Sequence, residues 1–192
     1  EAQRRIDQEL DLPPGYVIDW GGQFENLAAA RQRLMAVVPA CFLLIFILLY
    51  SALGSPRDAL LVFSAVPLAL TGGIAALWLT GTNLSVPASI GFIALFGIAL
   101  ENAMVLVTCM NQLVAGGASL REAAVAGAGL RLRPVLMTAL TTALGLIPLL
   151  LASGTGSEVQ RPLATVVIGG LTSSTLLTLV VLPALYPWFT RR

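Results

Sequence analysis

The sequence has no lysine and no histidine, and only 11% of its 192 residues are charged. A soluble domain of this size carries roughly twice that charged fraction. The lack of histidine excludes His-ligated zinc sites, histidine general bases and proteolysis by a serine–histidine pair. The net charge is +1, so nucleic acid, which requires a basic patch, is not an expected partner. These absences argue against a soluble enzyme.

Cysteine is also scarce, with Cys41 and Cys109 far apart in separate apolar runs. This spacing excludes a C-x-x-C metal clip. We predict that both are small apolar packing residues and that they form no disulfide. The sequence begins at Glu1 without a signal peptide, and its first 33 residues are already polar and patterned. We therefore expect the C-terminal part of a longer protein.

Long apolar segments dominate what is present. Hydrophobic residues make up 57% of the chain, and the mean hydropathy is +0.86. Five segments are each long enough to cross a hydrocarbon core of ~30 Å. They lie at about 34–53, 59–80, 87–114, 134–152 and 162–189. The sequence thus predicts an all-α polytopic membrane protein with five transmembrane helices, of which the longer third and fifth should tilt.

Two further signals lie within and between these spans. Prolines inside the spans predict local kinks, since neighbouring helices satisfy the freed backbone groups; they are Pro39, Pro67, Pro148 and Pro183. Ser119-Leu-Arg-Glu122 has the spacing of a capping box. We therefore predict a helix over about 119–130, lying along the membrane surface as an interfacial helix.

The polar segment 1–33 is expected to be the tail of an extramembrane domain. Residues 1–10 have the pattern of an amphipathic helix, which Pro13-Pro14-Gly15 would end. Tyr16-Val-Ile-Asp-Trp20 has strand composition, and Gly21-Gly22 follows it. This mixture predicts the end of an α/β domain, followed from Phe24 by a helix that leads into the membrane.

The distribution of arginine predicts the orientation. Near the predicted spans, one side carries six arginines and the other carries three, which are Arg31, Arg33 and Arg161. The positive-inside rule places the richer side in the cytoplasm; its arginines are Arg57, Arg121, Arg131, Arg133, Arg191 and Arg192. The leading segment and the loop 153–161 are then expected outside, and the C-terminus inside.

Glu101 is the most informative single residue. It is the only charged residue between Asp58 and Arg121, and it lies in the middle of the third span. An unpaired ionised carboxyl near bilayer mid-depth costs several kcal/mol, so such residues are usually placed to handle protons or ions. A neutral, hydrogen-bonded structural role remains the alternative. The adjacent Asn102 can bind across helices in either case.

Arg131 and Thr138 are further candidates near the fourth span. They are seven residues apart and share a helix face two turns from each other. Arg133, beside Pro134, is interpreted as an interfacial anchor. We predict no catalytic residue and no cofactor in this chain. We also predict no metal-binding residue, because core packing explains its four methionines better than soft-metal binding does.

Three long motifs resemble the resistance-nodulation-division (RND) efflux pumps. The first is Arg131-Leu-Arg-Pro-Val-Leu-Met-Thr-Ala-Leu140. The second, Gly156-Ser-Glu-Val-Gln-Arg-Pro-Leu-Ala164, looks like the heavy-metal efflux branch in particular. The third, Pro14-Gly-Tyr-Val-Ile-Asp-Trp-Gly-Gly-Gln23, is similar to that branch's last periplasmic porter segment. The resemblance covers the whole chain.

The resemblance implies residues 1–33 as the end of a periplasmic porter domain and 34–192 as the last five of twelve spans. It further implies an inner-membrane homotrimer in contact with lipid, driven by proton influx and working with a periplasmic adaptor and an outer-membrane channel. The family's proton relay has a charged residue at the position of Glu101. Asn102, Arg131 and Thr138 match other relay positions.

Departures from the copper and silver exporters favour divalent metals. Those exporters have lysine where this sequence has Val135, and methionines where it has Val167 and Leu171. Multidrug export by the same fold is one alternative. A non-transporting RND relative, such as a protein-export helper, is another, although such relatives lack the porter-like segment. An intramembrane enzyme is the remote option, because no proteolytic motif is present.

Overall fold

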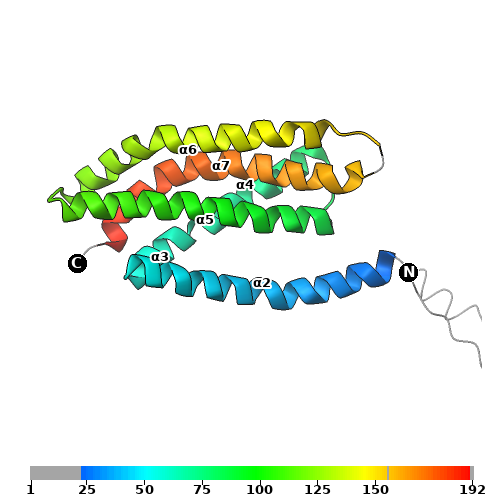
Figure 1. The fold of residues 1–192 in the computed structure, drawn as a ribbon, viewed down its shortest axis with the longest axis horizontal. Helices are drawn as coiled ribbons and strands as arrows, with labels where there is room; N and C mark the ends of the chain where they lie inside the picture. The colour runs from blue at the N-terminus through cyan, green and yellow to red at the C-terminus, as the bar shows by residue number, and fades with distance from the viewer. Residues whose placement is uncertain (1–22, 155, 191–192) are drawn as a thin grey trace, which may run out of the picture. The chain divides into compact units, whose positions relative to one another are not determined.

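The computed structural model describes residues 23–154 and 156–190, with side chains from residue 35 onward (Figure 1). The chain divides into two compact units, Glu1–Val37 and Val38–Arg192. Only the beginning of one helix is described in the first unit. The predicted strand at 16–20 and the other predictions for residues 1–22 lie outside the described residues.

All regular elements of the described residues are helices. They are α2 (Gln23–Leu53), α3 (Pro56–Phe63), α4 (Ala65–Thr80), α5 (Val86–Ala115), α6 (Leu120–Leu151) and α7 (Ser157–Phe189). Five stretches are long and apolar enough to cross a membrane: Met35–Leu53, Pro56–Thr80, Val86–Ala115, Leu120–Leu151 and Ser157–Phe189. The prediction of an all-α protein with five spans is confirmed.

Serine caps explain where three of the helices begin: Ser55 at α3, Ser85 at α5 and Ser119 at α6. Ser55 Oγ accepts a hydrogen bond from the Asp58 backbone N–H, and Pro56 follows at the start of α3. Proline is favoured there because the first-turn N–H groups have no helical partner. Ser119 Oγ accepts from the Glu122 N–H at 3.3 Å, while the Glu122 carboxylate accepts from the Ser119 N–H at 3.0 Å. The predicted capping box is therefore confirmed.

One helix boundary differs from the prediction. The segment 119–130 is not a separate helix, because α6 runs without a break from Leu120 to Leu151. Pro134 removes one N–H donor, but the Ala-rich residues before it favour helix, and the chain stays helical through the proline. The second span is divided at Ser64 into α3 and α4, close to Pro67, where a kink was predicted. Pro67 lies one turn beyond this break and cannot donate to the carbonyl four residues earlier.

Helix α7 lies at the centre of the bundle and packs against α3, α4, α5 and α6 (Figure 1). Glycines allow its close approach to α4 and α5. A Cβ atom added at Gly72 would lie 2.8 Å from the Gly169 carbonyl oxygen, and one at Gly170 would collide with the Leu95 side chain. Small residues at these positions thus allow close helix packing.

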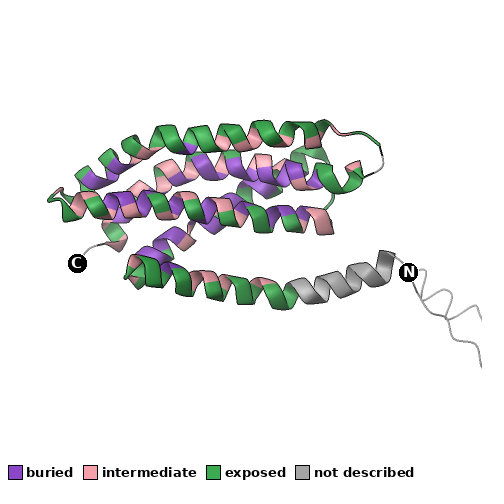
Figure 2. Cartoon of the chain, in the orientation of Figure 1, coloured by how far each residue is buried: buried purple, intermediate pink, exposed green. Residues whose placement is uncertain are grey.

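Helix α6 is the most exposed of the helices in the unit Val38–Arg192 that pack on α7 (Figure 2). Few of its residues are buried, and most of those are small: Ala123, Ala124, Gly127 and Val135. Large apolar side chains point away from the bundle, among them Leu130, Leu140, Leu144 and Leu151. An apolar outer face of this kind suits contact with lipid or with further membrane helices.

Candidate functional site

Glu101 lies in the middle of α5, and its side chain is exposed. Its neighbours Leu100 and Ala103 are buried in the bundle. The carboxyl group therefore points away from α7, on a helix apolar and long enough to cross a membrane. A carboxyl in that position must be neutral, or must be paired with a group that covers this face of α5.

Asn102 points the other way. Its side chain is half-buried, and its Nδ2 atom is fully buried with no hydrogen-bond partner. An unpaired buried donor costs about 1–3 kcal/mol. Adjacent residues in α5 thus present an acid to the outside and an amide donor to the interior.

Arg131 and Thr138 both lie on α6, two helical turns apart as predicted. Arg131 is half-buried and Thr138 is exposed. The Thr138 hydroxyl donates to the Pro134 carbonyl at 3.0 Å. This bond lies within the helix and does not reach another helix.

The packing of α5 against α6 relates these residues to Glu101. The two helices are antiparallel, and a Cβ atom added at Gly127 would lie 2.6 Å from Met110 Cγ. Nine residues back along α5 from Met110 is Glu101, and nine residues forward along α6 from Gly127 is Leu136. Glu101 therefore lies at a level between Arg131 and Thr138, roughly 8 and 3 Å away along the axis, but nine residues are two and a half turns, so it lies on the opposite side of α5 from Met110. No hydrogen bond or ion pair joins Glu101, Asn102, Arg131 and Thr138 to one another.

A second polar cluster, which sequence reasoning missed, joins three helices at one end of the bundle. Asn111 of α5 donates through Nδ2 to Asp58 Oδ2 of α3 at 3.0 Å. The Tyr186 hydroxyl of α7 donates to Asn111 Oδ1 at 2.6 Å. The Thr190 hydroxyl donates to the other carboxylate oxygen of Asp58 at 3.4 Å. Asp58 and Tyr186 are both buried, and the three bonds are part-buried.

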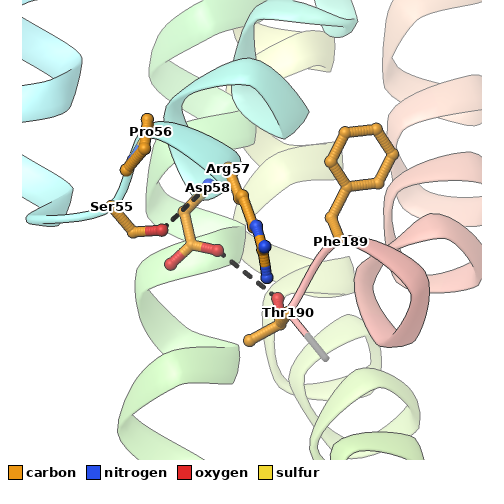
Figure 3. Close-up of a pocket in the computed structure, with 6 residues that line it drawn as sticks. All are labelled: Ser55, Pro56, Arg57, Asp58, Phe189 and Thr190. Atoms are coloured by element: carbon orange, nitrogen blue, oxygen red, sulfur yellow. Dashed lines mark hydrogen bonds between the residues drawn. The ribbon is translucent and has the colours of Figure 1, made fainter. Parts of the chain in front are cut away.

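A cavity of about 210 Å³ lies beside this cluster (Figure 3). Residues at the start of α3 and at the end of α7 line it: Ser55, Pro56, Arg57, Asp58, Phe189 and Thr190. The cavity brings the polar edge of the cluster to the surface. The sequence signal for the cluster was weak, since Asp58 three residues after Ser55 has the position of an ordinary first-turn acid.

The described side chains show no metal centre. Among residues 35–154 and 156–190, no three His, Cys, Asp or Glu side chains lie close enough together to share a metal ion. Cys41 is exposed, Cys109 is buried, and neither forms a disulfide. The last finding agrees with the prediction for both cysteines.

Comparison with known proteins places these features in a family. Residues 1–190 match the AcrB/AcrD/AcrF family. The chain is 58% identical to Protein HelA of Legionella pneumophila and 53% identical to the cobalt-zinc-cadmium resistance protein CzcA of Cupriavidus metallidurans. Each alignment covers 97% of this chain and 18% of the relative.

A solved structure agrees with both the sequence match and the fold. The crystal structure of a heavy metal efflux pump superposes with a TM-score of 0.83 at 50% sequence identity, covering 100% of this chain and 19% of that one. The chain thus spans about a fifth of the length of the proteins it matches. With five apolar spans, an intramembrane carboxyl and these relatives, the chain belongs to the AcrB/AcrD/AcrF family of RND efflux pumps and, within it, to the heavy-metal efflux branch.

Proposed function

We propose that the chain works as part of a longer secondary active transporter that exports heavy-metal cations in exchange for protons. The observation that carries this proposal is Glu101, an exposed carboxyl in the middle of α5. It is the only charged residue between Asp58 and Arg121. No enzymatic chemistry is needed from such a group. It has to gain and lose a proton, and the change in charge has to alter its surroundings.

In this mechanism Glu101 binds a proton from the periplasmic side and releases it to the cytoplasm. Protonation removes the charge and with it any pairing that the carboxylate makes across the exposed face of α5. The loss of pairing changes the position of α5 against its neighbours, which drives the periplasmic porter domain through its transport states. One proton moving down 100 mV supplies ~2.3 kcal/mol for this work.

Asn102, Arg131 and Thr138 are proposed as the other members of the relay. Two features support them: the level of Glu101 lies between those of Arg131 and Thr138, and Asn102 is adjacent to Glu101 in α5.

The proposed substrate is a divalent cation. Relatives at 52–53% identity have names that include cobalt, zinc, cadmium and nickel resistance. The cation efflux protein CusA of Escherichia coli is less similar, at 39% identity. Val135, Val167 and Leu171, which replace lysine and methionines of the copper and silver exporters, favour the same substrate class.

The assembly proposed for the full transporter is a homotrimer in the inner membrane, joined to a periplasmic adaptor and an outer-membrane channel. The segment 1–33 lies on the periplasmic side, as the end of the porter domain, and the C-terminus lies in the cytoplasm. The arginine distribution supports this orientation. The membership of the family supports the assembly.

Metal resistance of an efflux-deficient Gram-negative host tests the proposal. The host expresses the full-length transporter, either as wild type or as Glu101→Gln, which keeps the size of the side chain and removes its proton. We expect wild type to protect against a divalent metal and Glu101→Gln to lose that protection. Glu158→Gln is the matched control, since Glu158 is an exposed acid in the first turn of α7.

Two results would contradict the proposal. Full resistance in Glu101→Gln, at equal expression, would show that proton coupling does not depend on this carboxyl. If the wild type protects against no metal but lowers sensitivity to drugs, the multidrug alternative replaces metal export.

A further inference from the structure

Three buried polar atoms of the described side chains have no hydrogen-bond partner: Asn102 Nδ2, Thr175 Oγ1 and Thr178 Oγ1. Buried polar groups are nearly always paired, so each exception needs an explanation. Other threonines of α7 satisfy their hydroxyls within the helix. Thr165 donates to the Arg161 carbonyl and Thr172 to the Ile168 carbonyl, both at 2.8 Å. Thr175 and Thr178 do not make this bond.

The register of α5 against α7 can be read from two contacts. The Leu95 side chain occupies the space beside Gly170, and Asn111 is bonded to Tyr186. Leu95 and Asn111 are sixteen residues apart on α5, and their partners are sixteen residues apart on α7. The two helices are therefore parallel and stay in step between these contacts.

This register brings the three unpaired atoms to one level. Seven residues beyond Leu95 on α5 is Asn102, and seven residues beyond Gly170 on α7 is Leu177. Thr175 and Thr178 lie on either side of that level, within one helical turn, or roughly 5 Å along the axis. Seven residues are two turns, so Asn102 also lies on the face of α5 that meets α7 at Leu95.

We propose that Asn102, Thr175 and Thr178 bind a buried water molecule between α5 and α7, at the level of Asn102. We further propose that the two threonines act as positioning residues of the relay. The role in the relay rests on the proposed function. The water site rests on the three buried atoms alone. A buried water makes about three hydrogen bonds to polar groups that otherwise have none, which is the number available here.

The donors and acceptors fit water. The Asn102 amide donates, and each threonine hydroxyl can donate or accept. A water molecule can accept from the amide and from one hydroxyl while it donates to the other hydroxyl. The three atoms include no carboxylate, so the site suits a neutral ligand better than a cation.

The site gives Glu101 a link to the centre of the bundle. Asn102 follows Glu101 on α5, and α7 contacts α3, α4, α5 and α6. A movement of α5 on protonation of Glu101 would change the distance from Asn102 to a water held by Thr175 and Thr178. Through that water, α7 would respond to the charge on Glu101, although no hydrogen bond joins Glu101 to α7.

Two substitutions of matched shape test the proposal in the full-length transporter. Thr175→Val with Thr178→Val keeps the volume and removes both hydroxyls. Thr175→Ser with Thr178→Ser keeps the hydroxyls and removes a methyl group from each. A high-resolution structure of the wild type should show water density within hydrogen-bond distance of all three atoms, and the valine variant should lose it. Hydroxyls bonded to helix carbonyls, with no water, would overturn the site.

Transport in proteoliposomes tests the role in the relay. An imposed pH gradient drives Zn²⁺ and, in parallel, Cd²⁺ transport by wild type, both threonine variants and Glu101→Gln. We expect the valine variant to transport about tenfold more slowly, a factor that corresponds to about 1.4 kcal/mol, with a thermal stability no higher than that of wild type. The serine variant should stay near wild type.

The outcomes separate the two proposals. If Glu101→Gln stops transport but the valine variant is as fast as wild type, the threonines have no role in the relay, although the proposed function stands. If the valine variant is also more stable than wild type, removal of the hydroxyls has relieved a dry, unpaired site, and the water site is overturned as well. If Glu101→Gln transports normally, the proposed function fails, and the water density alone decides the site.

Discussion

At the scale of single residues, the cluster of Asp58, Asn111 and Tyr186 shows how polar side chains hold apolar helices together. Asn111 uses its amide nitrogen toward α3 and its amide oxygen toward α7, so one side chain joins three helices. In an apolar surrounding each of these groups is costly if it is left unpaired. The arrangement of the three helices at this end is therefore set by polar contacts as well as by packing.

Tyr186→Phe should lower the stability of the protein. The change removes the donor to Asn111 Oδ1 and leaves a part-buried acceptor unpaired, while the ring remains in place. We expect a loss of about 1–2 kcal/mol, measured as the free energy of unfolding of the purified protein in detergent. Tyr50→Phe is the control, since Tyr50 is 50% exposed. Equal stability of both variants would mean that the Tyr186 bond contributes nothing.

At the scale of helices, the contacts of α7 with α4 and α5 depend on the absence of side chains. A Cβ atom at Gly169 would collide with Ala76 Cβ, and the Gly72 carbonyl oxygen would lie 3.2 Å away. Because both neighbours are short and lie on or next to the backbone, neither can move aside without shifting a helix. Close packing of this kind is a main source of helix association in membranes, where no hydrophobic effect acts between helices.

Gly169→Ala should therefore destabilise the bundle, although alanine favours helix. We expect a cost of about 1–3 kcal/mol from overpacking. Gly145→Ala provides the matched control, because Gly145 lies in α6 with open space around it. That variant should gain up to about 1 kcal/mol from helix propensity. Thermal unfolding of the two variants side by side measures both effects, and equal shifts in Tm would contradict the close-contact argument.

The sequence was sufficient for features that depend on local chemistry. The five spans follow from their length and hydropathy, and the Ser119 capping box follows from a spacing of three residues. Features that depend on tertiary contacts were not predictable. The bond between Asp58 and Asn111 joins residues 53 positions apart, and no local pattern encodes it.

The candidate site shows the same division. Glu101 was identifiable from sequence, because a lone carboxyl within an apolar span is rare. The relation of Asn102 to Thr175 and Thr178 required the register of α5 against α7. The assignment of Arg131 and Thr138 to a relay with Glu101 stays a prediction, since no hydrogen bond or ion pair joins them to it.

At the scale of the whole unit Val38–Arg192, the two ends of the bundle differ. The start of α3, the turn from α5 to α6 and the end of α7 share one end, as the bonds of Asp58 to Asn111 and Thr190 show. The turn from α4 to α5 and the loop from α6 to α7 lie at the other end (Figure 1). The first end carries Arg57 and Arg121, so it is the end that we place in the cytoplasm.

Cysteine labelling in whole cells tests this orientation. In a full-length background with Cys41→Ala and Cys109→Ala, single cysteines are introduced as Ala115→Cys at the α5–α6 turn and Ser153→Cys in the α6–α7 loop. Both positions are exposed. A maleimide that crosses the outer membrane but not the inner membrane should label Ser153→Cys in intact cells and Ala115→Cys only after the inner membrane is opened. The reverse pattern would show that the topology is inverted. The proton flow proposed for Glu101 would then run in the wrong direction, because a proton gradient can drive export only if this carboxyl binds its proton from the periplasmic side.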